Sequence, residues 1–404
     1  MKRRDILKRL GLLPFASGLT SALIPSQSAN ANPSPAKRNV FKELGIRTFI
    51  NAAGTYTFMT GSLMQDEVVE AWESASKEFC ILDEVQDKVG EKIAAITKAE
   101  SAVVTAGCFS AMTLGLAGVL TGMDADKAAK LPHIEGTGMK SEVIMQKGHN
   151  VGYAQALTNT GCKVVYVETI ADVEKAINDN TALLWFLNIQ SDKGQITHEQ
   201  WVALGKKHNI PTMIDIAADV PPVTNLWKFN EIGFDLVCVS GGKAMRGPQS
   251  AGILMGKKNL IAAARLSMPP RGANIGRGMK INKEEIIGMY VALDHFVNTD
   301  HEKQTKIWHD SISLIENAAK SVTGVTTKVT TPVLGNVTPT LTVSWDTNKF
   351  KTKDLQEKLR NGNPSIEVIS SGEGSINITT WVMKRGEDKI VAKRLKEDLT
   401  SLLA

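Results

Sequence analysis

The fold is decided by an apolar strand that ends in two glycines and a lysine, Phe234-Asp-Leu-Val-Cys-Val-Ser-Gly-Gly-Lys243-Ala-Met-Arg246. Partial burial at a strand exit favours the neutral form of an amine, whose lone pair can then form a Schiff base. Lys243 is therefore a candidate attachment point for pyridoxal 5'-phosphate (PLP). The alternative is a solvated lysine beside a glycine-rich turn.

A second apolar strand carries an aspartate at its exit, in Ile210-Pro-Thr-Met-Ile-Asp215-Ile-Ala-Ala-Asp219. PLP acts as an electron sink when a carboxylate keeps its ring nitrogen protonated. Asp215 precedes Lys243 by 28 residues, which leaves room for one strand–loop–strand step. Asp215 could instead cap the next turn. Together the two positions predict a PLP site in which Lys243 and Asp215 are the catalytic residues.

Five motifs follow one another along the chain: Ile50-Asn-Ala-Ala-Gly-Thr-Tyr-Thr57, Val89-Gly-Glu-Lys-Ile-Ala94, Ala99-Glu-Ser-Ala-Val-Val-Thr-Ala-Gly107, Asp215-Ile-Ala-Ala and Ser240-Gly-Gly-Lys-Ala-Met-Arg-Gly-Pro-Gln249. In these motifs the chain resembles the fold-type I PLP-dependent enzymes of the selenocysteine synthase-like family, and most closely the D-glucosaminate-6-phosphate ammonia-lyase-like branch. Selenocysteine synthases look more like Ser-Gly-Asp-Lys where this chain has Ser-Gly-Gly-Lys243. The resemblance covers nearly all of the chain after residue 31.

Strand and helix signals alternate along the chain, which is typical of an α/β fold with a mostly parallel sheet and helices on both faces. Predicted strands lie near residues 102–105, 142–146, 163–167, 182–188, 212–216, 236–239 and 252–255. A long helix is expected from Ile286 to about Ala319, followed by a β-β-α-β-β-α pattern at residues 326–330, 338–345, 353–360, 366–370, 376–383 and 388–403. The resemblance implies the PLP-dependent transferase fold with a small C-terminal α+β domain.

The sequence predicts five segments along the chain. They are a signal peptide (1–31), an N-terminal segment (32–80), a large PLP-binding domain (81–290), a connecting helix (291–321) and the small domain (322–404).

The cofactor's phosphate is expected where Gly107-Cys108-Phe109 opens a helix, because the amide groups of a helix N-terminus bind anions. A tight turn into a core helix would give the same pattern. The resemblance implies that His149 stacks on the pyridine ring. It also implies that the Ser240 hydroxyl binds the phosphate, and Arg246 pairs with that phosphate or with an acid group of the substrate.

Substrate contacts are expected from the N-terminal segment and from one loop. Thr55 and Tyr56 belong to a segment that borders the active site in such enzymes, and Asn51 precedes them. Arg271 and Arg277 lie in a loop rich in glycine and positive charge. This loop could clamp a substrate carboxylate, reach a partner's cofactor across a dimer, or simply be solvated.

The expected reaction is an α,β-elimination from a hydroxylated amino acid or an amino-sugar acid, which yields a 2-keto acid and ammonia. The same lysine could also serve an amino acid racemase or an aminotransferase, and these remain alternatives. A third alternative is a protein that binds PLP without catalysing a reaction. The substrate is expected to be a small molecule without a phosphate ester, and the protein to be a homodimer or a higher homo-oligomer.

The first residues predict export. A basic start with the pair Arg3-Arg4 precedes an uncharged, mostly apolar stretch and the cleavage-like site Ala29-Asn-Ala31. This pattern is typical of a twin-arginine signal and of a periplasmic protein without a membrane anchor after cleavage. Five basic residues and one acid in this leader give +4, which leaves about +1 of the formal +5 for the mature chain. A chain so close to neutral has no excess of positive charge that would predict binding of nucleic acid.

Cysteine and histidine spacings predict no metal site. The cysteines Cys80, Cys108, Cys162 and Cys238 form no Cys-x-x-Cys pair, and the histidines form no His-Glu-x-x-His pair. Free thiols are expected, with Cys108 and Cys238 in the core.

Overall fold

The computed structural model describes residues 38–404, so the predicted signal peptide and residues 32–37 lie outside the described part. The chain divides into two compact units, residues 1–47 and residues 48–404. Of the first unit, the structure describes helix α1 (Val40–Glu43), whose N-cap Asn39 accepts a hydrogen bond from the amide of Lys42 at 3.0 Å. Both predicted globular domains fall within the second unit.

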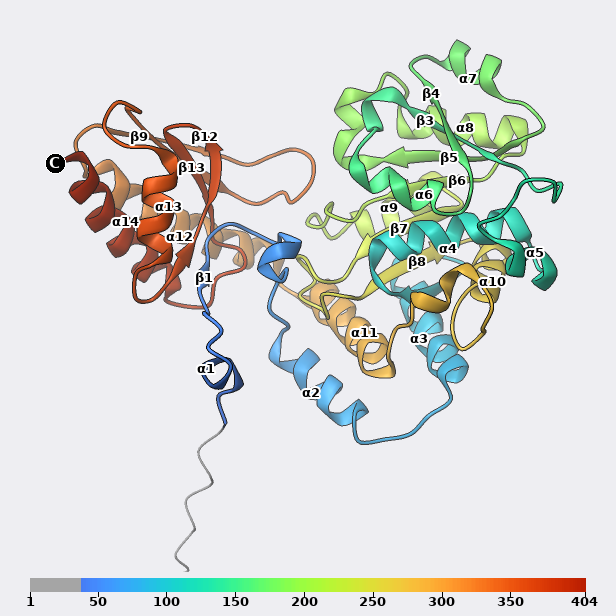
Figure 1. The fold of residues 1–404 in the computed structure, drawn as a ribbon, viewed down its shortest axis with the longest axis horizontal. Helices are drawn as coiled ribbons and strands as arrows, with labels where there is room; N and C mark the ends of the chain where they lie inside the picture. Colours follow the sequence, from blue (N-terminus) through green and yellow to red (C-terminus); the bar gives the residue numbers. More distant parts are fainter. Residues whose placement is uncertain (1–37) are drawn as a thin grey trace, which may run out of the picture. The chain divides into compact units, whose positions relative to one another are not determined.

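A seven-stranded sheet forms the centre of the large domain (Figure 1), in the order β2-β8-β7-β6-β5-β3-β4. Within this sheet β8 runs opposite to the six other strands, and the remaining pairs are parallel, which confirms the predicted mostly parallel sheet. Its strands are β2 (Ser101–Thr105), β3 (Glu142–Gln146), β4 (Lys163–Val167), β5 (Thr181–Leu187), β6 (Thr212–Asp215), β7 (Leu236–Ser240) and β8 (Gly252–Gly256).

Two apolar cores cover the two faces of this sheet. Along β7, Leu236 and Cys238 join one core while Val237 and Val239 join the other, because successive side chains of a strand point to opposite faces. The helices of the large domain are α2 (Asp66–Ala75), α3 (Leu82–Thr97), α4 (Gly107–Thr121), α5 (Ala125–Lys130), α6 (Gln155–Thr158), α7 (Ile170–Ala176), α8 (His198–His208), α9 (Asn225–Ile232) and α10 (Lys258–Leu266). Short 3-10 helices are η1 (Thr57–Met59), η2 (Lys147–His149), η3 (Gly152–Ala154), η4 (Asn188–Lys193) and η5 (Ile275–Gly278).

The uncharged run of residues 101–123 forms strand β2 and the buried helix α4, as predicted. A Cβ at Gly115 would lie 2.6 Å from Cε of Met213 and 3.2 Å from Cδ1 of Leu254, so this glycine lets α4 lie close on the sheet. Among the described residues, no helix is both long and apolar enough to cross a membrane.

The single helix predicted from Ile286 to about Ala319 is wrong. The structure has two helices here, α11 (Lys283–Asn298) and α12 (His301–Lys320). Asp300 breaks the run because its side chain accepts a hydrogen bond from the amide of Lys303 at 3.0 Å, which starts a new helix. The connection between the domains is therefore a pair of helices.

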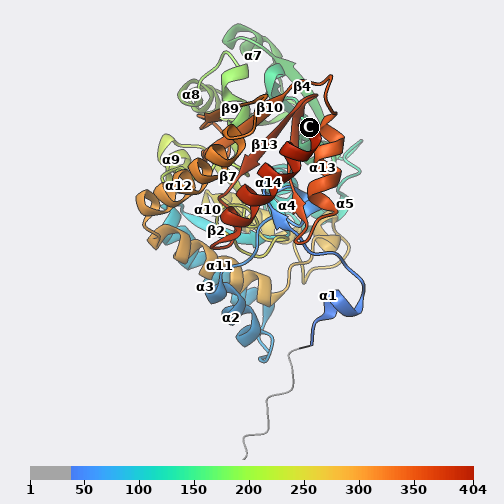
Figure 2. The same ribbon diagram turned by 90° about the vertical axis from the view of Figure 1, so that its left-hand side faces the viewer.

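The small domain is a four-stranded antiparallel sheet in the order β12-β13-β10-β9, with helices packed against it (Figure 2). Its elements are β9 (Val325–Thr330), β10 (Thr340–Trp345), α13 (Thr352–Arg360), β12 (Ile369–Gly372), β13 (Ser375–Thr379) and α14 (Glu387–Leu403). The strand predicted at residues 366–370 is divided, because β11 (Ile366–Glu367) pairs in parallel with β1 (Ile50–Asn51) instead. The N-terminal segment thus packs into the core of the small domain.

Candidate functional site

Asp215 and Lys243 lie at the carboxyl ends of two adjacent strands, β6 and β7, the edge at which open parallel sheets bind ligands. Asp215 is buried, and its Oδ1 accepts hydrogen bonds from the amide of Ala217 at 2.8 Å and from Sγ of Cys108 at 3.4 Å. Among the described residues, both hydrogen-bond donors to this carboxylate bind Oδ1, so Oδ2 of Asp215 is open to a further donor. Burial raises the pKa of Asp215, while the nearby positive charge of Lys243 opposes that rise. A buried carboxylate of this kind fits a cationic ring nitrogen.

The turn that carries Lys243 is closely packed. The amide of Gly241 donates to the carbonyl of Ala251 at 2.8 Å, and the amide of Arg246 donates to the carbonyl of Lys243 at 3.0 Å. A Cβ at Gly242 would lie 2.5 Å from Cα of Gln249, so only glycine fits there. Lys243 is half-buried at the start of this turn. Its backbone is held in the turn, and its positive charge acts on Asp215, Cys108 and Asp219.

The predicted phosphate loop lies beside Asp215. Gly107 begins α4 with a left-handed φ of 84°, and no side chain caps the helix N-terminus. Strand β8 lies close to the N-terminus of α4 because residue 252 is glycine. A Cβ at Gly252 would lie 2.6 Å from the amide nitrogen of Cys108. Phe109 is half-buried in the same turn. The unused amides of this turn fit a phosphate group.

Cys108 links the phosphate loop to the carboxylate. Burial raises the pKa of the Cys108 thiol well above its usual value, and the negative charge of Asp215 raises it further. Cys238 lies on β7 and is also buried, as predicted, and its pKa is raised chiefly by burial. Cys108 is thus a neutral hydrogen-bond donor. All four cysteines are free, and Cys80 is exposed.

His149 is fully buried at the end of η2, near β5. Its Nδ1 accepts a hydrogen bond from the amide of Leu187 at 3.2 Å, and its ring meets Phe186 edge-on with centroids 4.5 Å apart. Burial lowers the pKa of His149 to about 4, so the ring is neutral. Nε2 is buried and has no partner among the described residues. Stacking of His149 on the cofactor stays a prediction, as does the phosphate contact of Ser240, which is half-buried at the end of β7.

The structure adds Asp219, to which the sequence analysis assigned no role. Its side chain is 2% exposed, and its Oδ1 accepts a hydrogen bond from the amide of Gly335 in the small domain at 3.1 Å. Burial raises the pKa of Asp219 to about 6, and Asp215 and Lys243 are among the charges that act on it. Asn188 also hydrogen-bonds this carboxylate. The sequence does hold a signal that could have pointed to Asp219. It is a second aspartate four residues after Asp215, in a stretch of small apolar residues.

The segment that follows the predicted substrate residues Thr55 and Tyr56 packs on the Lys243 turn, because the amide of Ser62 donates to the carbonyl of Gly242 at 3.1 Å. Their contact with a substrate stays a prediction, as does that of Arg271 and Arg277. Tyr56 is exposed and Thr55 is half-buried before η1. Asn51 closes a local turn, because its Oδ1 accepts hydrogen bonds from the amides of residues 53 and 54, each at 3.0 Å. The guanidinium of Arg271 pairs with Asp83 of α3 at 3.2 Å, and Arg277 is exposed in η5.

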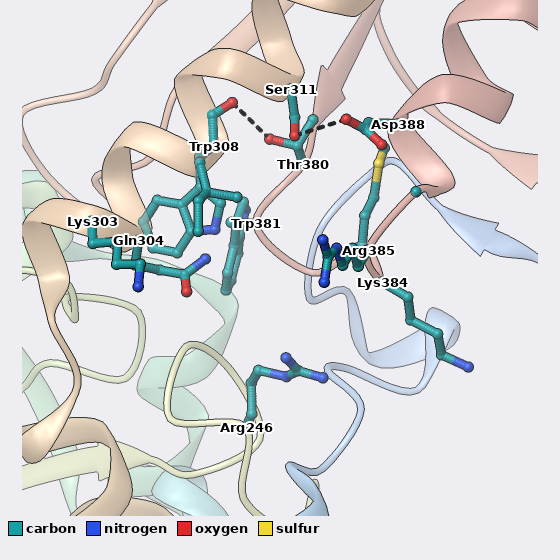
Figure 3. Close-up of a pocket in the computed structure, with 13 residues that line it drawn as sticks. Arg246, Lys303, Gln304, Trp308, Ser311, Thr380, Trp381, Lys384, Arg385 and Asp388 are labelled. Carbon is teal, nitrogen blue, oxygen red and sulfur yellow. Dashed lines mark hydrogen bonds between the residues drawn. The ribbon is translucent and has the colours of Figure 1, made fainter.

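The last predicted site residue, Arg246, lines a cavity whose other residues come mainly from α12 and the segment before α14 (Figure 3). Its Nε donates to the carbonyl of Leu63 at 2.8 Å. Its pairing with the cofactor's phosphate or with a substrate acid group stays a prediction. In residues 38–404, no cluster of three or more histidine, cysteine or acidic side chains is placed to hold a metal ion.

The family described as SelA, L-seryl-tRNA selenium transferase, matches residues 49–351. The chain belongs to this family. It is 27% identical over 374 residues to a D-glucosaminate-6-phosphate ammonia lyase of Salmonella typhimurium, covering 89% of this chain and 97% of that protein. The predicted resemblance is thereby confirmed.

The fold is similar to solved structures over nearly the whole chain. A D-glucosaminate-6-phosphate ammonia-lyase structure superposes with a TM-score of 0.79 at 26% identity, covering 91% of this chain and 100% of that one. A serine palmitoyltransferase solved with PLP superposes with a TM-score of 0.56 at 14% identity, covering 88% of this chain and 89% of that one. The latter likeness concerns the fold alone. Together they confirm the predicted fold-type I architecture.

Proposed function

We propose that this protein is a PLP-dependent lyase that acts on a hydroxylated amino acid or an amino-sugar acid by α,β-elimination. Membership of the family and the likeness to an ammonia lyase along the chain support this proposal. The observation that carries it is the buried carboxylate of Asp215, with Oδ2 open, within electrostatic reach of Lys243 at adjacent strand ends.

PLP, when bound, withdraws electrons from the bonds at the α-carbon of an amino acid joined to it. Nζ of Lys243 would hold the cofactor's carbonyl carbon, and Oδ2 of Asp215 would keep a proton on its ring nitrogen. The amides of residues 107–109 at the N-terminus of α4 and the Ser240 hydroxyl would bind its phosphate. His149 would present its neutral ring to the cofactor.

The chain's own residues then move and hold protons. Nζ of Lys243, once free, accepts the α-proton as general base. The same ammonium group can return a proton to the β-hydroxyl, which leaves as water. Return of Nζ of Lys243 to the cofactor's carbonyl carbon would free the amino group of the resulting enamine, which would take up one water to give the 2-keto acid and ammonia. The hydrogen bonds from Cys108 and Ala217 to Oδ1 keep the Asp215 carboxylate in one orientation throughout.

An absorbance spectrum of the purified protein tests the assignment of Lys243. A protonated Schiff base absorbs at roughly 410–430 nm. We expect this band in the native protein and in Lys258→Ala, which removes an exposed lysine at the start of α10. The band should be absent from Lys243→Ala. A colourless native protein that added PLP cannot restore would refute the proposal.

Product analysis separates the lyase from its alternatives. With amino acids that carry a β-hydroxyl, a lyase releases ammonia and a 2-keto acid in equal amounts. A racemase would abolish optical rotation without releasing either product, and an aminotransferase would require a keto-acid acceptor. Transfer to a tRNA is not part of the proposal, because the mature chain's net charge is close to neutral.

We also propose that the protein works in the periplasm after export by the twin-arginine route. Arg3-Arg4, the apolar stretch that follows and the cleavage-like site support this, all of them outside the described residues. Replacing the pair by Arg3→Lys and Arg4→Lys should leave the protein in the cytoplasmic fraction. Unchanged periplasmic recovery would contradict this route.

A homodimer or a higher homo-oligomer is also proposed. Phe79 and Ile81 are 105% and 68% exposed, and they line an apolar cavity with Val85 and Ile287. Large exposed apolar side chains are typical of protein–protein contact surfaces. Sedimentation should show an oligomer that Phe79→Ser and Ile81→Ser together weaken. A native monomer would contradict the proposal.

A further inference from the structure

A loop of the small domain, residues 331–339 between β9 and β10, docks on the large domain. Its first three residues are exposed, Val333 at 89%. Gly335, by contrast, is buried and has a left-handed φ of 79°. A Cβ at Gly335 would lie 2.8 Å from Cδ1 of Ile189, which follows the exit of β5. The loop therefore touches the large domain at the edge where the parallel strands end.

A single hydrogen bond anchors this loop. The amide of Gly335 donates to Oδ1 of Asp219 at 3.1 Å. Among the described residues, no other hydrogen bond joins residues 331–339 to the large domain. A segment that few contacts hold can open locally at a small cost in free energy, while the rest of the fold stays intact.

The acceptor of this bond is fixed on the large domain. The carbonyl of Asp219 accepts a hydrogen bond from Nδ2 of Asn225 at 2.7 Å, and its amide donates to the carbonyl of Ile216 at 3.1 Å. Its side chain is buried, and Asn188 at the exit of β5 also hydrogen-bonds it. A carboxylate is a stronger acceptor than a neutral oxygen, so Asp219 suits the task of holding one amide.

The turn that holds Asp219 also holds the carboxylate of the proposed cofactor site. The amide of Ala217 donates to Oδ1 of Asp215 at 2.8 Å, two residues before Asp219. The charges of Asp215 and Lys243 both act on the Asp219 carboxylate. The docked loop thus rests beside the two groups that would hold the cofactor, and its movement would change access to them.

We propose that the 331–339 loop is a lid over the strand ends that carry Asp215 and Lys243, and that Asp219 is the positioning residue that holds this lid closed. The role of the lid in the reaction rests on the proposed function. A closed lid excludes water from the reacting groups, and an open lid admits the cofactor and the substrate. Asp219 acts through the amide of Gly335 rather than on the substrate itself.

Hydrogen exchange of the full chain, measured by mass spectrometry on peptides that span residues 331–339, reports on opening of the lid. Asp219→Leu keeps an acyclic side chain of similar size but removes the acceptor, so exchange at the Gly335 amide should rise by at least about tenfold. Asp219→Asn keeps an acceptor oxygen and should restore most of the protection. The matched control is Asp126→Leu, at an exposed position on α5. Peptides that span β13 should exchange equally in all variants, which separates release of the lid from loosening of the whole small domain.

Access to Lys243 gives a second measurement on the PLP-loaded protein. O-benzylhydroxylamine attacks the cofactor's carbonyl carbon and releases Lys243, so it removes the absorbance band. We expect the band to disappear about tenfold faster in Asp219→Leu than in the native protein, and at close to the native rate in Asp219→Asn. Circular dichroism verifies that each variant is folded, and Asp219→Ala replaces the leucine variant if that one does not fold. Native exchange in the loop of Asp219→Leu, or a native rate of band loss, would overturn the inference.

The inference and the proposed function fail in different ways. A coloured protein that releases ammonia, with native exchange in the loop of Asp219→Leu, overturns the lid and leaves the lyase in place. A colourless protein in which Asp219→Leu raises exchange in the loop refutes the lyase and keeps the lid.

Discussion

The replacement Asp219→Asn is expected to change how the protein's stability depends on pH. Asp219 is 2% exposed, and burial raises its pKa from 3.8 to about 6. A shift of this size corresponds to about 3 kcal/mol of free energy, since one pKa unit is worth about 1.4 kcal/mol. This is a large share of the stability of a typical domain.

The sign follows from proton binding. Because the folded-state pKa of Asp219 lies above its unfolded value, the native state holds the extra proton between about pH 4 and about pH 6. This carboxyl therefore contributes stability below about pH 4 that is lost as the pH rises through about 6. Asparagine does not titrate, and its side-chain oxygen can still accept the amide of Gly335. The variant's stability relative to the native protein should thus rise by about 3 kcal/mol from pH 4 to pH 7.

Urea unfolding at a series of pH values, followed by tryptophan fluorescence, measures this difference. The control is Asp126→Asn, which removes the same charge from an exposed position on α5. A difference between variant and native protein that stays constant over this range would refute the reasoning. Such a constant difference would mean that the folded state ionises Asp219 at little cost in free energy.

Four other changes have specific expected outcomes. Gly107→Ala should cost about 1–2 kcal/mol because of its left-handed φ of 84°, and thermal unfolding should show less stabilisation by added PLP. Trp201→Ala removes a fully buried side chain and should lower the free energy of unfolding by about 3–5 kcal/mol in urea. Gly90→Ala should lower the melting temperature, since its Cβ would meet the carbonyl of Ala102 at a cost of about 1–3 kcal/mol. Asp215→Asn should reduce keto-acid release by about a hundredfold or more while the protein still takes up PLP.

Much of the sheet could be predicted because its strands are short apolar runs between turn residues. The predicted strands at residues 142–146 and 163–167 coincide with β3 and β4. The connection between domains was harder, because residues 298–306 are all polar and give no apolar pattern that marks a boundary, so only the cap geometry shows where α12 begins. The division of residues 366–370 was not predictable either, since its cause is pairing with Ile50, far away in the sequence.

In the candidate site, too, contacts between residues far apart in the sequence could not be predicted. Lys243 and Asp215 could be found because each stands at the exit of a strand, and parallel strands bring their exits to one edge. The hydrogen bond between Cys108 and Asp215 joins positions that no local pattern connects. Arg271 was predicted from loop composition, and its pairing with Asp83 became visible only in the folded chain.

The sequence by itself determined the order of the strands along the chain and the placing of a lysine and an aspartate at two of their ends. These are local properties, set by runs of neighbouring side chains. The tertiary structure alone decided that Asp219 is buried against the small domain and that Arg246 and Arg385 line one cavity. Burial and the closeness of charges depend on which distant segments pack together, and the same packing sets their pKa values and the ligands they can hold.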